Sequence, residues 1–220
     1  MNTVPRCRLP AVALFAALGT QSALAGMVTV DVTARSTAIA TASATAGASA
    51  ADTVIVFDPL DATPVPSHDA AIVDQVDKKF VPRVSVVRTG TAITFPNSDR
   101  IRHQVYSFSH AKTFTLKLYA GSPRTAVIFD QPGLVILGCN IHDNMLAYVG
   151  VVDSPYFAKL SDSGTATLNL PAGRYRLRAW HPNAVAAVPP REISVAAAPI
   201  SIPITINVDS TASAVAAWPE

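Results

Sequence analysis

The residues best suited to chemistry form one short cluster. The run Gly138-Cys139-Asn140-Ile141-His142-Asp143-Asn144-Met145 places a thiolate, an imidazole and a thioether three residues apart. A strand followed by a tight loop can turn these side chains towards one point, and His103 is the best candidate for a second imidazole from another strand. Two imidazoles in a plane with a thiolate, plus a weak axial thioether, bind copper in electron-transfer sites.

Other metals fit these residues less well. Mg²⁺ and Ca²⁺ prefer carboxylate oxygens, and structural zinc commonly takes paired cysteines. The cluster therefore predicts one type 1 copper site with the ligands His103, Cys139, His142 and Met145. In such a site the cysteine binds as thiolate and the neutral imidazoles bind through ring nitrogens.

This set of ligands predicts outer-sphere transfer of single electrons rather than catalysis. The sequence shows no apparent acid/base pair, no Gly-rich phosphate loop and no nucleophile-elbow pattern, so we expect no enzyme activity. Two other functions stay open. One is a copper chaperone or sensor that holds Cu(I) without passing electrons on, and the other is a structural β protein.

The elements that must position these residues are strands. Beyond Gly26, short β-branched runs alternate with turn residues, and no apolar 3.6-residue period is long enough for a convincing helix. We therefore expect an all-β chain built from sandwiches or barrels. Strands are predicted at residues 28–32, 53–58, 83–87, 92–95, 104–107, 114–119, 125–129, 133–137, 145–152, 165–169, 174–181, 192–196 and 201–208.

The central part of the chain resembles the cupredoxins, the small blue copper proteins. The Cys-x-x-His-x-x-Met spacing is similar to the short ligand loop of amicyanin, and residues 90–99 followed by His103-Gln104-Val105 are similar to the segment that carries the first copper histidine. The resemblance implies a Greek-key β-sandwich over residues 67–156. It also implies that Asn97 ties the two ligand segments together and hydrogen-bonds near the cysteine sulfur. Residues 80–156 look closest to exported cupredoxin-like proteins labelled methylamine utilization proteins.

The flanking segments resemble a second β-sandwich. The runs Ser161–Leu168 and Leu170–Pro182 look like the later half of a carboxypeptidase-regulatory or transthyretin-like module. Its early strands are expected within residues 26–66 and its remainder within 157–209, so that the copper domain is inserted into a discontinuous sandwich. Two consecutive domains are the alternative. The tail, residues 210–220, is expected to fray.

The N-terminal 25 residues are typical of a cleaved secretory signal. Arg6 and Arg8 precede an apolar stretch, and Ala23-Leu24-Ala25 supplies small residues for cleavage after Ala25. The stretch is too short to span a bilayer, so we expect a mature protein in the periplasm or secreted. Cys7 leaves with the signal. Cys139 then remains as a lone thiol in an oxidising compartment, where burial, a partner or a metal must protect it.

The charge distribution bears on the partner. The full chain has 17 basic and 15 acidic residues and a net charge of +2, with no long run of like charge, which argues against nucleic-acid binding. The middle segment, residues 76–152, holds nine basic and four acidic residues. We therefore expect a redox partner protein with an acidic surface. Among the other histidines, His110 is expected on the surface, and His68 and His181 lie in no motif.

Overall fold

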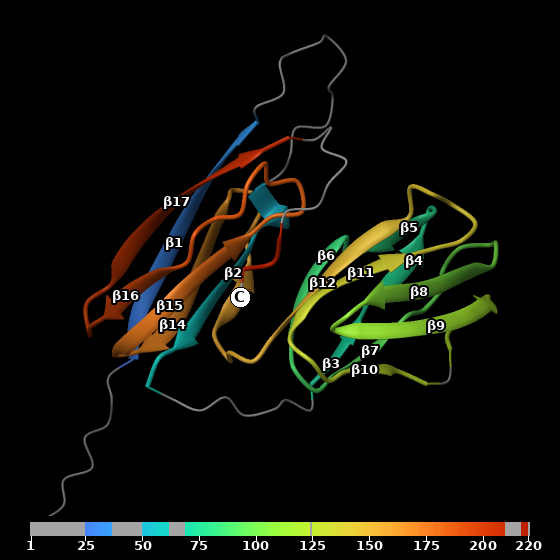
Figure 1. Ribbon diagram of the computed structural model, residues 1–220, viewed down its shortest axis with the longest axis horizontal. Helices are drawn as coiled ribbons and strands as arrows, with labels where there is room; N and C mark the ends of the chain where they lie inside the picture. The colour runs from blue at the N-terminus through green and yellow to red at the C-terminus, as the bar shows by residue number, and fades with distance from the viewer. Residues whose placement is uncertain (1–24, 37–49, 62–68, 124, 210–216, 220) are drawn as a thin grey trace, which may run out of the picture.

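The computed structural model describes residues 25–36, 50–61, 69–123, 125–209 and 217–219 (Figure 1). The prediction of an all-β chain is confirmed: the described residues form strands and one 3-10 turn, Ala50–Asp52. The strands are β1 (Ala25–Ser36), β2 (Val54–Pro59), β3 (Ala70–Ile72), β4 (Asp74–Val76), β5 (Lys79–Val81), β6 (Val84–Arg88), β7 (Thr91–Thr94), β8 (His103–Ser109), β9 (Lys112–Tyr119), β10 (Val127–Phe129), β11 (Gly133–Gly138), β12 (Leu146–Val152), β13 (Phe157–Lys159), β14 (Thr165–Pro171), β15 (Gly173–Trp180), β16 (Arg191–Val195) and β17 (Ile200–Val208).

One pair of sheets, which we call the flanking sandwich, takes strands from both ends of the chain. Its sheets have the orders β14-β1-β17 and β13-β2-β15-β16. Strand β1 pairs antiparallel with β14 and parallel with β17. The two sheets enclose a core that includes Val28, Phe57, Leu177 and Ile206. Residues on both sides of the intervening strands therefore build one sandwich.

The strands between these two pieces form the central sandwich. Its sheets have the orders β10-β7-β3 and β6-β12-β11-β8-β9, and β4 and β5 form a separate hairpin. The core between the sheets includes Ile93 from β7, Phe129 from β10, Leu137 from β11 and Val149 from β12. Strands β11 and β8 are neighbours in the larger sheet, and this contact brings the two sequence-predicted ligand segments together.

The two sandwiches are joined by strands whose alternate side chains point to opposite faces of the sheet. On β12, Val149 and Val151 face the central core, whereas Tyr148 and Val152 belong to a third apolar cluster. Strand β2 behaves likewise, because Ile55 faces the core of the flanking sandwich and the neighbouring valines join the third cluster. The sandwiches thus pack sheet against sheet, side by side in Figure 1.

The described end of the C-terminal tail packs against the rest of the fold. Residues 210–220 were expected to fray, yet within the described part, 217–219, Trp218 packs over Trp180 with ring centroids 5.4 Å apart. The carbonyl oxygen of Pro219 accepts a hydrogen bond from Arg178 at 2.6 Å. The tail lies over Gly150, where a Cβ atom would come within 2.2 Å of the Trp218 ring. The absence of a side chain at Gly150 makes room for this docking.

The shortest strands and the N-terminal segment mark the limits of what the sequence predicts and what the structure describes. The three-residue strands β3, β4, β5 and β13 were not predicted, because a run this short shows little alternation. The predicted signal segment up to residue 24, and His68, lie outside the described residues, and the predicted domain limits stay predictions. In the described part of the chain, no helix is long and apolar enough to cross a membrane.

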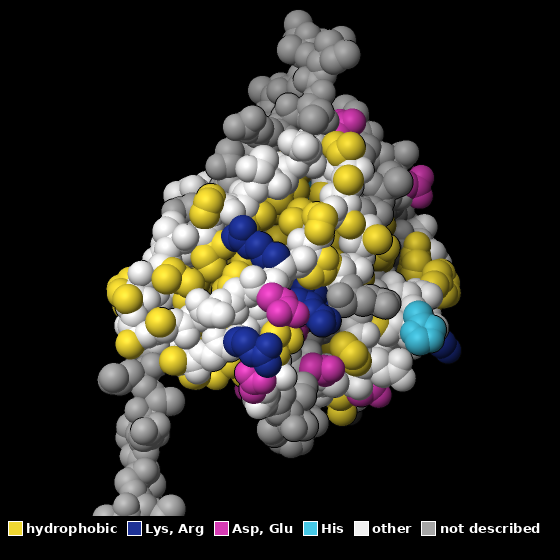
Figure 2. Space-filling view, turned by 60° about the vertical axis from the view of Figure 1, so that its left-hand side comes forward, with side chains coloured by type: hydrophobic (Ala, Val, Ile, Leu, Met, Phe, Trp, Pro, Cys, Tyr) yellow, Lys and Arg dark blue, Asp and Glu magenta, His cyan; other side chains and the backbone are white. Residues whose placement is uncertain are grey.

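An apolar groove lies in the flanking sandwich between β15 of one sheet and β17 of the other. Figure 2, which brings the left-hand side of Figure 1 forward, shows hydrophobic side chains exposed among basic and acidic ones. The groove has a volume of about 310 Å³, and Leu177 and Ala179 of β15 and Ile204 of β17 are among the residues that line it. It belongs to the flanking sandwich and lies apart from the predicted copper ligands.

Candidate metal centre

The strand ends explain how two predicted ligands come to lie on one loop. Strand β11 ends at Gly138, and the chain then turns through Cys139 and His142 before β12 begins at Leu146. The turn is closed by a hydrogen bond of 3.0 Å from the backbone N–H of Met145 to the carbonyl of His142. This short connection is the tight loop after a strand that the sequence predicts.

A neighbouring strand supplies the third ligand. His103 is the first residue of β8, which pairs with β11 through Tyr106 and Gly138. The His103 side chain is completely buried, and Cys139 is 4% exposed. The sheet therefore holds the histidine and the cysteine from two adjacent strands inside the same sandwich.

The three side chains converge on one point. One ligand atom each from His103, Cys139 and His142 lies within 4.8 Å of the other two. The Sγ atom of Cys139 is 3.8 Å from Nδ1 of His103. The two imidazole rings have centroids 5.2 Å apart and an interplanar angle of 56°. A single ion placed between these atoms can be reached by all three.

An orphaned ring nitrogen tests whether this point fits a metal. Nδ1 of His142 is buried and has no hydrogen-bond partner among the described residues. A buried polar atom without a partner costs roughly 1–3 kcal/mol, so native structures rarely leave one unexplained. Metal coordination would satisfy this nitrogen. A thiolate with two imidazoles is a set of donors that suits copper, and His103, Cys139 and His142 therefore fit a copper ion.

Met145 lies in the same buried region. It is 1% exposed and belongs, together with Cys139, to the core cluster of the central sandwich. Its placement directly after the turn keeps the thioether on the inner side of the sheet. Its role as the axial ligand stays a prediction.

The Asn97 side chain makes other hydrogen bonds than the one near the cysteine sulfur that the resemblance implies. Its side-chain Nδ2 donates hydrogen bonds to the carbonyls of Ile101 and Tyr119, at 2.9 and 2.8 Å. Its Oδ1 accepts the backbone N–H of Asp99 at 3.0 Å. The amide group thus braces the loop that leads into β8 against the end of β9, and both of its donors are used away from the cysteine sulfur.

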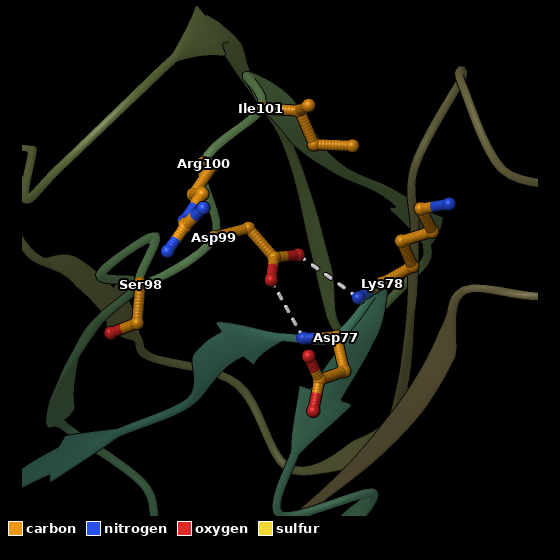
Figure 3. Close-up of a pocket in the computed structure, with 6 residues that line it drawn as sticks. All are labelled: Asp77, Lys78, Ser98, Asp99, Arg100 and Ile101. Atoms are coloured by element: carbon orange, nitrogen blue, oxygen red, sulfur yellow. Dashed lines mark hydrogen bonds between the residues drawn. The ribbon is translucent and has the colours of Figure 1, made fainter.

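Asp99 is a residue of this site that the sequence did not reveal. Its Oδ2 atom lies 2.7 Å from Nε2 of His103. The same carboxylate accepts the backbone N–H groups of Asp77 and Lys78 (Figure 3). Burial raises the pKa of the Asp99 carboxyl. The hydrogen bonds from Lys78, His103 and Asp77 lower this pKa by more than burial raises it, so it lies below its usual value.

Tyr119 forms part of the packing behind the ligands. It pairs with His103 across β8 and β9, and its hydroxyl donates to the carbonyl of Phe95. The Nε2 group of the buried Gln75 donates to the same hydroxyl oxygen. Burial is the main cause that raises the pKa of Tyr119 to about 12, and the nearby Asp74 and Cys139 raise it further.

The other described histidines lie away from this centre. His110 is exposed in the turn between β8 and β9, seven residues along an extended strand from His103, a separation of roughly 23 Å. His181 is buried next to the flanking sandwich, where its Nδ1 accepts the backbone N–H of Asn183 at 3.0 Å. Neither histidine is brought to Cys139.

Comparisons with known proteins complete the description. No family model matches the chain, and no curated protein matches it. A copper-containing nitrite reductase from Thermus scotoductus SA-01 is 23% identical over 43% of this chain, with a TM-score of 0.35. A purple cupredoxin from Nitrosopumilus maritimus is 21% identical over 38% of this chain and 99% of its own, with a TM-score of 0.33.

Amicyanin from Paracoccus versutus is also similar to part of the chain. It is 17% identical over 43% of this chain and 96% of its own, with a TM-score of 0.32. The chain spans only 25% of the nitrite reductase. The likeness to each of these solved structures covers less than half of this chain.

Proposed function

We propose that this chain binds one copper ion in a type 1 site and transfers single electrons, without acting as an enzyme. The observation that carries the proposal is the convergence of His103, Cys139 and His142 within 4.8 Å, with one buried ring nitrogen left unpartnered among the described residues. Met145 is proposed as the weak fourth ligand. Bound copper would supply one-electron exchange between Cu(I) and Cu(II).

The protein fixes the positions of the metal ligands and excludes water from them. Cys139 binds as thiolate, and the two histidines bind as neutral imidazoles. His103 and Cys139 are anchored at the ends of two paired strands and are both buried, so water is kept from them. Ligands fixed by a packed sheet rearrange little when the charge at the centre changes, and this favours fast electron exchange.

An acidic redox partner is proposed to dock over His142. On the same stretch of chain, Ile141 directly before this half-buried residue and Leu146 four residues after it are 49% and 44% exposed. Arg100 and Arg102, which precede the ligand His103, are also exposed. Apolar contact with a flanking basic charge suits a partner with acidic groups, because charge complementarity speeds the encounter and fixes its orientation.

The flanking sandwich is proposed as a scaffold for the copper domain. The sheets of the two sandwiches share an apolar layer that contains Tyr148 and Trp180. Such a layer fixes the orientation of one sandwich on the other. We further propose export to the periplasm or beyond the cell after cleavage of the signal segment, because basic residues, an apolar stretch and Ala23-Leu24-Ala25 follow one another there as in a secretory signal. In an oxidising compartment the Cys139 thiol would be protected by its burial and by a bound metal.

A copper titration with matched variants tests this proposal. The purified protein should bind one copper ion, His103→Ala should lose at least ten-fold in affinity, and His110→Ala should bind as the wild type does, because His110 is an exposed histidine in a distant turn. Equal affinity of all three proteins would refute the site.

Voltammetry of the loaded protein separates the proposed function from a copper chaperone or sensor. An electron carrier should cycle reversibly between Cu(I) and Cu(II). Poor or irreversible cycling, together with tight Cu(I) binding, would contradict electron transfer and indicate a copper chaperone or sensor.

A further inference from the structure

The carboxylate behind His103 carries an inference beyond the ligand set. The Asp99 Oδ2 atom lies 2.7 Å from Nε2 of His103, whose side chain is fully buried, while the Asp99 side chain is 12% exposed. An ionised carboxylate can only accept hydrogen bonds, so Nε2 must carry the proton. In the neutral ring the lone pair then belongs to Nδ1, the nitrogen that faces Sγ of Cys139 at 3.8 Å.

The carboxylate is itself held in place by a backbone turn. Between β4 and β5, Asp77 and Lys78 have φ angles of 50° and 58°. Their consecutive N–H groups point to Asp99, with N···O distances of 2.7 and 2.9 Å to Oδ1 and Oδ2 (Figure 3). Two backbone amides in this conformation form a small anion-binding concavity. The backbone N–H of Asp99 is held in turn by Oδ1 of Asn97.

These contacts form one chain from the turn to the ligand. The turn fixes the Asp99 carboxylate, the carboxylate fixes the proton and the ring plane of His103, and the ring presents Nδ1 to the cysteine. A carboxylate bonded to the far nitrogen of a ligating histidine raises the basicity of that ligand. Its negative charge also favours the more positive of two metal charge states.

We propose that Asp99 is a positioning residue for the copper centre. Its carboxylate holds His103 in the tautomer protonated at Nε2, and its negative charge lowers the reduction potential of the bound copper by favouring Cu(II). This inference rests on the proposed function for the potential, but not for the tautomer. The turn between β4 and β5 acts with Asp99, because its two N–H groups keep the carboxylate in place.

Nitrogen-15 NMR of the metal-free protein tests the tautomer without copper. In the wild type, the imidazole shifts of His103 should report a proton on Nε2. In Asp99→Ala the share of the Nε2-protonated tautomer should fall, because the carboxylate that accepts this proton is gone. Asp77→Asn is the matched control, since it removes a neighbouring carboxylate but keeps the backbone N–H that Asp99 accepts. An unchanged His103 tautomer in Asp99→Ala would overturn the proposal.

Copper binding and voltammetry test the potential. Asp99→Ala should lose about 10- to 100-fold in Cu(II) affinity and less in Cu(I) affinity, and every ten-fold difference between the two losses raises the potential by about 59 mV. Asp99→Asn keeps an oxygen that can accept from His103 but removes the charge, so it should retain the tautomer and still raise the potential. Asp77→Asn should shift the potential less than either variant.

The outcomes distinguish this inference from the function on which it rests. Failure of the wild type to bind copper would refute the proposed function, and the NMR result would still decide whether Asp99 sets the tautomer. Copper binding with equal potentials for the wild type, Asp99→Asn and Asp99→Ala would refute the role of Asp99 and leave the function intact. Circular dichroism of each variant confirms that it is folded before the shifts are compared.

Discussion

Substitution of Gly150 by alanine should expel the C-terminal tryptophan from its place between the two sandwiches. A Cβ atom at position 150 would lie 2.2 Å from Cη2 and 2.8 Å from Cζ3 of Trp218. Non-bonded carbon atoms pack at about 3.5–4.0 Å, so the ring must move by more than 1 Å. Gly150 lies in the middle of β12 and cannot yield easily, because β11 and β6 pair with it on both sides.

The magnitude follows from the area that the ring buries. A fully buried tryptophan removes roughly 150–250 Å² from water, worth about 4–6 kcal/mol at 25 cal/mol per Å². Trp218 is only partly buried, so we halve this to about 2–3 kcal/mol. Alanine in a strand is favoured over glycine by about 0.5–1 kcal/mol. The net loss in the free energy of unfolding should therefore be about 1–2 kcal/mol.

Urea unfolding of four proteins measures this coupling. Gly150→Ala should destabilise the wild type, but in a Trp218→Ala background it should be neutral or slightly stabilising, because the clash has gone. Tryptophan fluorescence should shift to the red in Gly150→Ala, since only Trp180 and Trp218 contribute. Gly173→Ala is the control, because its Cβ would approach no atom closer than 3.6 Å. Equal destabilisation by Gly150→Ala in both backgrounds would refute the docking of the tail.

Three further outcomes are expected. Gly138→Ala should shift the absorption of copper-loaded protein, because its Cβ would lie 2.7 Å from the Tyr106 ring beside the cysteine, and Tyr106→Ala should restore the spectrum. Between pH 10 and 12 the metal-free protein should lose stability in thermal melts, since Tyr119 has its pKa raised to about 12 and its neutral form is favoured by folding. Tyr119→Phe should reduce this loss, and Tyr175, whose pKa burial also raises, should account for part of the remainder. Arg178→Ala should lower the free energy of unfolding by about 1–3 kcal/mol, measured in urea, because it breaks the paired hydrogen bonds to Asp58 at 2.6 and 2.9 Å.

The sequence predicts the all-β architecture well because burial on one face of a strand leaves a visible pattern. Along β17, residues of Ile200–Val208 alternate between exposed and buried positions. Along β12 the pattern is a continuous apolar run, and the structure explains this by burial on both faces. Runs of three residues such as β4 and β5 carry no such signal, and they were not predicted.

The convergence of Cys139 and His142 with His103 could be expected from the sequence because two of these residues share one short loop with regular spacing. The partners of these ligands could not, since they depend on contacts between distant segments. Asp99 lies only four residues before His103, but the contacts that fix its carboxylate come from Asp77 and Lys78 in the turn between β4 and β5, more than 20 residues away. Trp218 looked like part of a frayed tail because its neighbour Gly150 lies far away in the sequence.

The optical spectrum of the copper-loaded protein tests the central claim most directly. A thiolate of Cys139 bound to Cu(II) together with His103 and His142 should give an intense absorption near the red end of the visible spectrum, and Cys139→Ser should abolish it while leaving the fold intact. A colourless protein after addition of Cu(II), or a wild-type spectrum in Cys139→Ser, would contradict the assignment of this site to copper electron transfer.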